Sequence, residues 1–286
     1  MRIFKFFIPL LLLIPNISNA QFFELGLGIG GSVYYGDLSP DEALDNFKLV
    51  RPNIGVFASH HFNDRIAVQL GIQNFTLFGD DDINSKESLR NRNLSFRSNV
   101  WEISLKGEFY LLKFDPEKSD IPWSLYLSSG ASVFFHNPKG FFAGSYHALQ
   151  PLSTEGQGLE SFPDRKPYKL TQIAIPAIIG FKYNINPMIN LFVEFGPRFT
   201  FTDYLDDVSN TYAVGEELRS VKGDIAFNLS DKRLFPDGET KIYPDGAQRG
   251  NVKTNDMYFV GLAGISFTLD DVLGNLFGDK VRCPKF

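Results

Sequence analysis

Hydrophobic and polar residues alternate along eight segments of this chain. In the first segment, Phe23, Leu25 and Leu27 share one parity, whereas Glu24 and Gly26 share the other. Successive side chains of a β-strand point to opposite faces, so the pattern predicts a strand with one apolar face and one polar face. The alternation covers residues 23–35, 53–62, 65–75, 100–112, 123–135, 172–182, 190–202 and 257–269.

The connections between these segments alternate in length. They are long after the first, third, fifth and seventh segments and short after the second, fourth and sixth. Outer-membrane barrels have short periplasmic turns and longer surface loops, and closure of the sheet satisfies every backbone group in lipid. The sequence therefore predicts an all-β fold, an eight-stranded antiparallel transmembrane β-barrel with long extracellular loops. Both chain ends would then lie in the periplasm, and outer-membrane lipids would surround the barrel.

The first 20 residues have the features of a secretory signal. Arg2 and Lys5 precede an apolar run at residues 6–14, and small residues lead up to Ala20. The alternative is an uncleaved anchor, but the run is shorter than the roughly 20 residues of a spanning helix. We predict a cleaved signal peptide (1–20), an outer-membrane barrel with surface loops (21–270) and a periplasmic C-terminal tail (271–286).

Composition adds two constraints to this interpretation. The chain contains 29 Phe, which suits the outward aromatic girdles of a membrane barrel. Its formal net charge is -5 and it has no basic stripe, which argues against nucleic acid as a partner.

The single cysteine, Cys283, cannot form an internal disulfide. In an oxidising periplasm it could form an intermolecular disulfide or remain a free thiol.

Several charged residues fall on the inward parity of the predicted strands. The interior of an eight-stranded barrel is just wide enough for side chains, and an unpaired buried charge is costly. We therefore predict a plug of ion pairs and no open channel, rather than a proton or ion path. The inward charges are Glu102, Lys106, Glu108, Lys182, Glu194 and Arg198.

One string matches a dinucleotide-binding template. Gly26, Gly28 and Gly31 have the spacing G-x-G-x-x-G, but that template needs a following helix. Here the glycines lie inside an alternating strand. We interpret them as inward glycines that leave room for bulky neighbours across the lumen.

Candidates for chemistry are weak. His60 and His61 are adjacent, so a strand points them to opposite faces, and we expect both at the periplasmic rim as interface residues. His136, Ser132 and Glu194 offer the residue types of a hydrolase triad, but their spacing does not select them.

Two acidic stretches are candidate cation sites. Residues 80–82 and 203–207 are rich in Asp but lack EF-hand spacing, so solvated charge is favoured over calcium. We predict no catalytic residue, cofactor or metal ion.

The chain contains a set of distinctive strings, most of them in the predicted loops. They are YYGDL (34–38), RPNIGVF (51–57), NLSFRS (93–98), LQPLSTEGQGL (149–159), FPDRKPY (162–168), FTDYLDDVSNTY (201–212) and QRGN (248–251), with Cys-Pro at 283–284. In combination they resemble the PorG-type outer-membrane barrels of the type IX secretion system of Bacteroidetes. The resemblance covers nearly the whole chain after the signal.

The resemblance implies a non-enzymatic role in protein secretion and gliding. Family members associate with a periplasmic ring built from a lipoprotein and its partner subunit. We expect the periplasmic rim to make this contact, with Asn63, Asp64, Asn186, Pro187 and Cys283 as candidates. The alternatives are a barrel enzyme acting at the rim, an adhesin or porin-like barrel, and a soluble lipocalin-like barrel.

The long loops are expected to fold against one another as a cap. They carry acidic, basic and aromatic residues that are suited to mutual contacts. The candidates for pairing in this cap are Arg165, Asp203, Asp206, Asp207 and Arg249.

Overall fold

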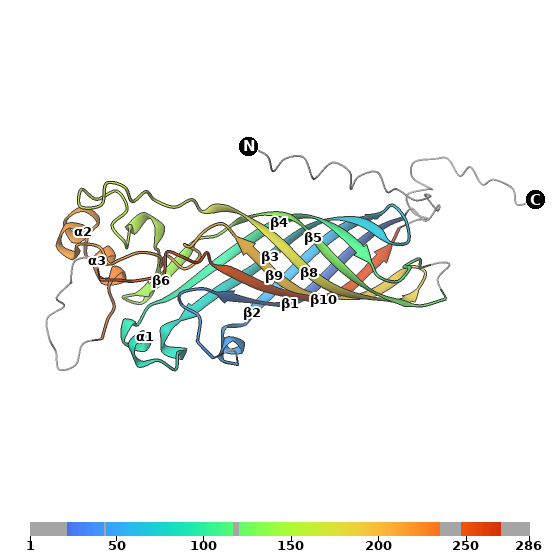
Figure 1. The fold of residues 1–286 in the computed structure, drawn as a ribbon, viewed down its shortest axis with the longest axis horizontal. Coiled ribbons are helices and arrows are strands. Elements are labelled where there is room, and N and C mark those ends of the chain that lie inside the picture. Colours follow the sequence, from blue (N-terminus) through green and yellow to red (C-terminus); the bar gives the residue numbers. More distant parts are fainter. Residues whose placement is uncertain (1–21, 43, 117–119, 235–246, 270–286) are drawn as a thin grey trace, which may run out of the picture.

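The chain forms a closed antiparallel barrel that continues at one end into a cap of loops and short helices (Figure 1). The computed structural model describes residues 22–42, 44–116, 120–234 and 247–269. The barrel strands are β1 (Phe22–Tyr35), β2 (Arg51–His61), β3 (Ile66–Asp80), β4 (Ser95–Tyr110), β5 (Trp123–Phe135), β8 (Thr171–Asn186), β9 (Ile189–Thr200) and β10 (Met257–Thr268). The predicted eight-stranded antiparallel barrel is thus confirmed. The predicted signal peptide and C-terminal tail, with Cys283, lie outside the described residues.

Neighbouring strands pair in sequence order, except where β5 pairs with β8. The circle closes between β1 and β10, with Glu24 opposite Thr268 and Tyr35 opposite Met257. Two strands, β3 and β4, run further toward the cap than the sequence predicts. Their extensions remain paired out to Asp80 and Ser95. The inward residues of the extensions, among them Leu77 and Phe96, are buried in the apolar core of the cap, which explains the added length.

The alternation of the sequence matches the two faces of the wall. Phe23, Leu25 and Leu27 are 46–48% exposed on the outside, whereas Glu24 is fully buried in the lumen. Ser266 and Thr268 are also buried, as the polar parity of the last segment predicts. The outside of the barrel is therefore apolar and the inside is largely polar.

The lumen is filled by paired charges. Their side chains are at most 4% exposed, and the pairs are Lys182–Glu24 (2.6 Å), Lys106–Glu194 (3.1 Å) and Arg198–Glu102 (3.7 Å). Glu108 accepts hydrogen bonds from Gln69 and Tyr110. The predicted plug of ion pairs is confirmed.

Glycines of β1 make room for ring side chains inside the barrel. A Cβ atom on Gly26 would lie 2.2 Å from the Phe57 ring, and one on Gly28 would lie 2.7 Å from Leu262. The interpretation of these two residues as space-makers is confirmed. Gly31 has the opposite parity and instead approaches Val50.

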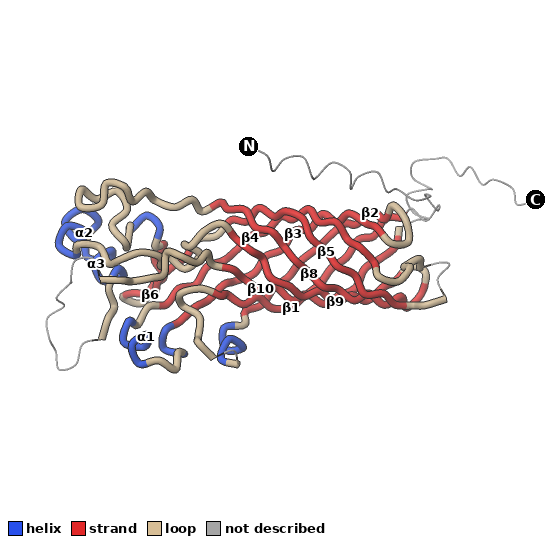
Figure 2. The backbone as a smooth tube through the Cα atoms, viewed as in Figure 1, coloured by secondary structure: helices blue, strands red, loops and turns tan. Residues whose placement is uncertain are grey.

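The cap contains a β-hairpin and several short helices (Figure 2). Its apolar core continues without a break from the barrel interior, because Tyr34, Phe75 and Tyr258 of the strands pack with Leu205 and Leu229 of the cap. Among the described residues, no helix combines the length and apolar composition needed to cross a bilayer. The elements are β6 (Pro138–Phe142), β7 (Ser145–Ala148), α1 (Glu87–Arg92), α2 (Gly215–Lys222), α3 (Asp224–Ser230), η2 (Asp45–Leu49), η3 (Asp81–Ile83) and η4 (Gln150–Leu152).

The end opposite the cap is closed by shorter connections. In two of them an Asn side chain shapes the turn. The Oδ1 atom of Asn63 accepts from the amides of Arg65 and Ile66, and that of Asn186 accepts from the amides of Met188 and Ile189. The described part of the chain also begins and ends at this rim, where the amide of Leu269 donates to Phe23.

Candidate functional site in the loop cap

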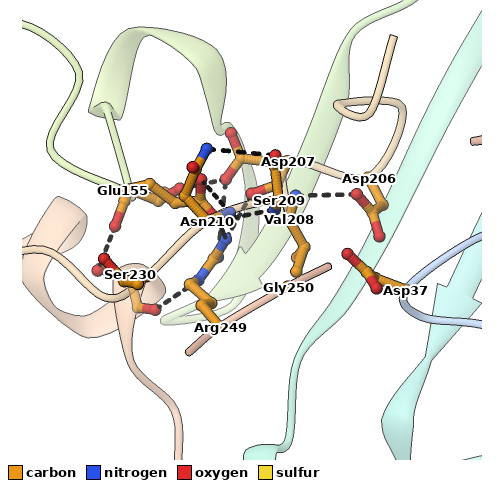
Figure 3. Close-up of polar contacts among 12 residues, drawn as sticks. Asp37, Glu155, Asp206, Asp207, Val208, Ser209, Asn210, Ser230, Arg249 and Gly250 are labelled. Carbon is orange, nitrogen blue, oxygen red and sulfur yellow. Dashed lines mark hydrogen bonds and ion pairs between the residues drawn. The ribbon is translucent and has the colours of Figure 1, made fainter. Parts of the chain in front are cut away.

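The cap is organised around a buried polar cluster built from two long loops (Figure 3). One loop follows β7 and contributes Glu155, and the other joins β9 to β10 and contributes Asp206, Asp207 and Arg249. All four residues are at most 3% exposed. Residues far apart in the sequence thus meet at one point above the barrel.

Arg249 is the centre of the cluster. Its guanidinium lies 3.1 Å from the Glu155 carboxylate and 3.8 Å from that of Asp207. It also donates to the backbone carbonyls of Ser230 and Asp207. The two nearby carboxylates raise the pKa of Arg249 above its ordinary value, against the effect of burial. A charge buried this deeply is tolerated because it is both paired and hydrogen-bonded.

The Glu155 carboxylate, like the Arg249 guanidinium, has several hydrogen-bond partners. Its carboxylate accepts hydrogen bonds from the amides of Ser209 (2.8 Å) and Asn210 (3.1 Å) and from the hydroxyl of Tyr204 (3.1 Å). These contacts fix the backbone that follows Asp207. The pairing therefore orders the second loop as well as neutralising a charge.

Asp207 adopts a left-handed backbone conformation with φ of 71°. Its carboxylate accepts from the hydroxyls of Tyr168 (2.7 Å) and Thr154. Burial raises the pKa of Asp207 to about 6, although Arg249 acts to lower it. A non-glycine residue in this conformation is uncommon and needs such fixed contacts to persist.

A second acidic pair lies where the cap meets the barrel. The hydroxyl of Tyr34 is 2.7 Å from the Asp206 carboxylate and 3.0 Å from that of Asp256. One hydroxyl proton serves only one acceptor at a time. Burial raises the pKa of both Asp206 and Asp256 well above the ordinary value. We infer that one of the two carboxyl groups carries a proton and donates to Tyr34.

The two remaining predicted cap residues are Asp203 and Arg165. Burial raises the pKa of half-buried Asp203 to about 7. Arg165 donates to the carbonyls of Glu155 (2.6 Å) and Thr211 (3.0 Å), and its guanidinium lies 3.9 Å above the Phe162 ring. Of the five predicted cap residues, the structure brings Arg249 and Asp207 together as an ion pair. Arg165 binds backbone carbonyls.

The cap also uses residues that the sequence argument missed. Glu155, Tyr34 and Asp256 carry main contacts of the two acidic groups described above. Arg92 forms a bidentate pair with Asp81, at 2.6 and 2.8 Å, and donates to two further backbone carbonyls. Tyr34 and Glu155 lie within the distinctive strings, whereas Arg92 and Asp256 lie just outside them, and no periodicity indicates which loop residues meet.

A groove of about 560 Å³ opens beside this cluster on the cap. Its wall includes Asp37, Arg92, Tyr212, Arg233 and Arg249. The cationic groups at this wall are engaged with protein acceptors: Arg92 binds Asp81, and Arg233 binds Asp231. The groove is therefore a polar surface with a fixed charge pattern.

The predicted rim residues lie at the opposite end of the barrel. Asn63 and Asn186 shape their own turns, as described above. Asp64 forms an ion pair of 3.3 Å with exposed Lys113, and Pro187 is exposed at the tip of the β8–β9 turn. Met188, beside it, is 62% exposed and was not anticipated from the sequence.

The two histidines at this end separate as predicted, but one of them is not at an interface. His60 packs on the outside against Phe23, with ring centroids 4.4 Å apart. His61 is buried inside the barrel, 3.1 Å from the carboxylate of Glu24. The expectation that His61 is an interface residue is wrong, because its parity places it in the lumen.

The three residues of the hydrolase alternative each have other partners. The Ser132 hydroxyl donates to the carbonyl of Ala174, and Glu194 is held by Lys106 and Tyr126. His136 lies 3.3 Å from the carbonyl of Lys169. Burial lowers the pKa of His136 to about 4, so its ring is neutral at physiological pH.

The acidic stretches also have protein partners. Asp80 accepts from the amide of Asp82, and Asp81 binds Arg92. Within the described ranges, no group of three or more His, Cys, Asp or Glu side chains is arranged to hold a metal ion. The carboxylates of the cap thus serve its internal contacts.

Comparison with known proteins gives a family and a set of fold neighbours. The family described as "Domain of unknown function (DUF6089)" matches residues 2–235. No curated protein matches the chain in sequence. The chain is similar to the solved structure of Neisserial surface protein A (NspA), with a TM-score of 0.42, 9% identity, and 86% of this chain and 96% of that chain covered.

Two further solved structures are similar at the same level. Ail, the attachment invasion locus protein of Yersinia pestis, has a TM-score of 0.41 at 9% identity, with 88% of this chain and 99% of that chain covered. The outer membrane protein OprG from Pseudomonas aeruginosa has a TM-score of 0.39 at 10% identity, with 87% and 96% covered.

Proposed function

The chain belongs to the family described as a domain of unknown function (DUF6089), and we propose that it anchors or assembles the periplasmic ring of the type IX secretion system at the outer membrane. In this role it catalyses no reaction. The resemblance of the loop strings to the PorG-type barrels supplies the system. The closed lumen supports anchoring over transport.

Placement in the membrane rests on the outer wall of the barrel. Large apolar side chains are exposed around its whole circumference, for example Ile29 (70%), Trp101 (53%) and Phe195 (54%). Soluble proteins rarely expose contiguous apolar patches of this extent. A bilayer covers such a band without leaving a backbone group unsatisfied, because the sheet is closed.

Orientation follows from the two ends of the barrel. Outer-membrane barrels place short turns in the periplasm and long loops outside. The folded cap would then face the cell exterior. The rim with Asn63, Asp64, Asn186 and Pro187, and the tail that carries Cys283, would face the ring.

The observation that carries the proposal is the blocked lumen. Lys182 and Glu24 meet at 2.6 Å across the interior, and both side chains are 0% exposed. A secreted protein cannot pass through a barrel filled in this way. A component of a secretion machine that cannot conduct cargo is suited to holding other components in place.

A mild-detergent pull-down of the tagged protein from outer membranes tests this proposal. We expect the ring lipoprotein and its partner subunit to be recovered, as identified by mass spectrometry. Deletion of residues 271–286 should weaken their recovery while the barrel still inserts. Met188→Lys tests the rim itself, and Lys253→Glu, in the cap, is the matched control. Recovery of a barrel without partners would contradict the ring role.

The state of Cys283 is tested in the same preparation. A non-reduced sample should contain a reducible adduct if the thiol forms an intermolecular disulfide. If the wild type shows no adduct, as Cys283→Ser must, Cys283 is a free thiol.

A second candidate function, binding of an external ligand as in an adhesin, is favoured by the groove of about 560 Å³ on the cap. Whole cells that display the protein would bind host or matrix material through this surface. Lys166→Glu, outside the groove, is the control for Asp37→Lys, within it. Equal adhesion of both variants and the wild type would contradict this function.

A further inference from the structure

The outer wall of β3 and β4 changes character at one level. Ile72 and Ile103 are directly opposite each other and are 43% and 45% exposed. The next outward position of β3 is Asn74, which lies opposite Trp101. Asn74 donates to Asn99 at 3.1 Å, also on the outside. An outward step from isoleucine to paired amides beside a tryptophan marks the boundary between hydrocarbon and headgroups.

Cationic side chains gather just beyond this boundary. Arg97 shares the outward parity of Trp101 and precedes it by four residues, so it lies about 13 Å along the strand toward the cap. Lys139 of β6 lies directly opposite Arg97 on one side, and Phe78 of β3 lies opposite it on the other. The guanidinium of Arg51 is 4.2 Å from the centre of the Phe78 ring. Arg51 begins β2 on its inward parity, but its guanidinium reaches Phe78 beside Arg97. Three cations thus form a row at the headgroup level.

This row is confined to one side of the barrel. In the described residues of β1, β5, β8, β9 and β10, no Lys or Arg faces outward, because Lys182 and Arg198 point into the lumen. At the corresponding level these strands present aromatic residues such as Tyr35, Phe199 and Phe259. The row is therefore a local cluster, and the other side of this rim has exposed Lys169, two residues before β8 begins.

The cations of this row lack the partners that neutralise cations elsewhere in the cap. Across the described ranges, no carboxylate forms an ion pair with Arg51, Arg97 or Lys139. Arg51 donates to the carbonyls of Lys48 and Val50, which orients it. The charge of Arg97 is close enough to repel that of Arg51, and Asp80 offsets this repulsion in part. An anion at this position would relieve the repulsion.

A groove of about 570 Å³ lies directly below the row on the same wall. Arg97 forms part of its upper wall, and apolar side chains of β1 and β2 form its lower part. Its lining includes Ile29, Pro52, Ile54, Asn74, Thr76 and Arg97. The groove is thus polar where it meets the cations and apolar at its lower end, where Ile29 and Ile54 lie level with Asn74 at the hydrocarbon boundary.

We propose that this wall binds a phosphate-bearing lipid of the surrounding leaflet, with its phosphate on Arg51, Arg97 and Lys139 and an acyl chain in the groove. Guanidinium groups bind phosphate oxygens through paired hydrogen bonds, and lysine adds a point charge. The apolar lower part of the groove accepts the chain, which a free phosphate lacks. The inference goes beyond the ring role and rests only on the membrane placement proposed above.

Native mass spectrometry of the folded protein in zwitterionic micelles tests the site. The micelles contain equal amounts of a phosphorylated lipid A and its dephosphorylated form. We expect the wild type to retain the phosphorylated lipid at least tenfold over the other. Arg97→Glu with Lys139→Glu should remove this preference, and Arg97→Gln with Lys139→Gln should reduce it. Lys166→Glu with Lys253→Glu makes the same change in charge on exposed cap residues and should leave it intact.

Several outcomes would overturn the proposal. They are equal retention of both lipids by the wild type, an equal loss in the control pair, and full displacement of the lipid by millimolar inorganic phosphate. The last result would assign a simple anion site. Gel mobility of unheated samples verifies folding of each variant. Because ring recovery in the pull-down is measured separately, failure of one proposal does not imply failure of the other.

Discussion

Arg249 and Glu155 form a 3.1 Å ion pair between side chains that are 2% and 0% exposed, and they join loops that are 94 residues apart in the sequence. This pair links the loop after β7 to the β9–β10 loop, together with the hydrogen bonds that Asp207 accepts from Thr154 and Tyr168. Removal of one partner leaves the other as an uncompensated buried charge, which is more damaging than loss of an exposed pair.

Arg249→Met should therefore loosen the cap by about 3–5 kcal/mol, the usual effect of breaking a buried pair. The barrel has its own ladder of hydrogen bonds and should stay closed. Limited proteolysis should cut the cap of the variant faster, while the unheated protein keeps its fast gel mobility. Lys253→Met, at an exposed cap position, is the control. Equal resistance of the two variants to protease would refute the role of the pair.

The cap should lose stability as pH rises toward 7. The pKa of Asp203 is raised to about 7, against about 3.8 for a free Asp. A carboxyl group whose folded pKa is raised stabilises the fold below its unfolded pKa, and this contribution is lost as pH rises through the folded value. Asp207, with a pKa of about 6, acts in the same sense over a lower range.

His136 acts in the opposite sense, so the wild-type pH dependence alone does not report on Asp203. Comparison with Asp203→Asn isolates the contribution of Asp203. The pKa of His136 is lowered to about 4, so it favours the cap above the pKa of a free histidine. The protection of residues 203–212 against hydrogen exchange, referenced to the intrinsic exchange rate at each pH, should fall between pH 5 and 8. The fall should be smaller in Asp203→Asn. Parallel curves for the two proteins would exclude Asp203 as the source.

Lys182→Met should destabilise the barrel itself. Glu24 would keep only His61 and neutral partners in a fully buried position, and the expected cost is about 3–5 kcal/mol. Adding Glu24→Gln should recover most of the loss, because the buried charge is then removed. The urea midpoint in detergent, followed by gel mobility, measures both effects. Lys113→Met breaks the exposed pair with Asp64 and should change stability by at most about 1 kcal/mol.

Gly26→Ala should overpack the lumen. Its Cβ atom would meet the Phe57 ring at 2.2 Å, and overpacking of this kind costs about 1–3 kcal/mol. Phe57→Leu in the same chain should relieve the clash. Gly107→Ala is the matched control, since its nearest contact would be 3.9 Å away. The same urea titration serves here, and equal midpoints for Gly26→Ala and Gly107→Ala would show that the close approach is unimportant.

Planar bilayers should record no steady conductance for the folded wild-type protein. The lumen is filled by paired charges and rings, and no continuous water path is expected through it. Stable single-channel steps that depend on protein concentration would contradict a closed plug and favour the porin alternative.

The barrel could be predicted because alternation is a local property of the sequence. Each strand reports its two faces within a few residues, and the lengths of connections order the strands. Parity and the narrow lumen predict that the inward charges pair, but they did not indicate Glu24 as the partner of Lys182. His61 differs from the expectation because its parity, and not its position near a turn, decides which face of the wall it occupies.

The cap could not be predicted in the same way, because no period relates its residues. Tyr34 belongs to the first strand, and Asp206 and Asp256 flank the last long loop, yet the three meet. Such contacts depend on how two long loops fold against each other. The sequence indicated that Arg249 and Asp207 are suited to a cap, but it did not indicate Glu155 as the partner.

The barrel closes between its first and last strands, and this has a consequence for its assembly in the cell. Until β10 arrives, both β1 and β9 present an edge of unpaired backbone groups, which invites pairing with other chains. The strand that removes both edges is made last, after the whole of the cap. A chain interrupted before Met257 would carry the loops of the cap on a sheet that cannot close, and it would also lack Tyr258 and Val260, which complete the apolar core between barrel and cap.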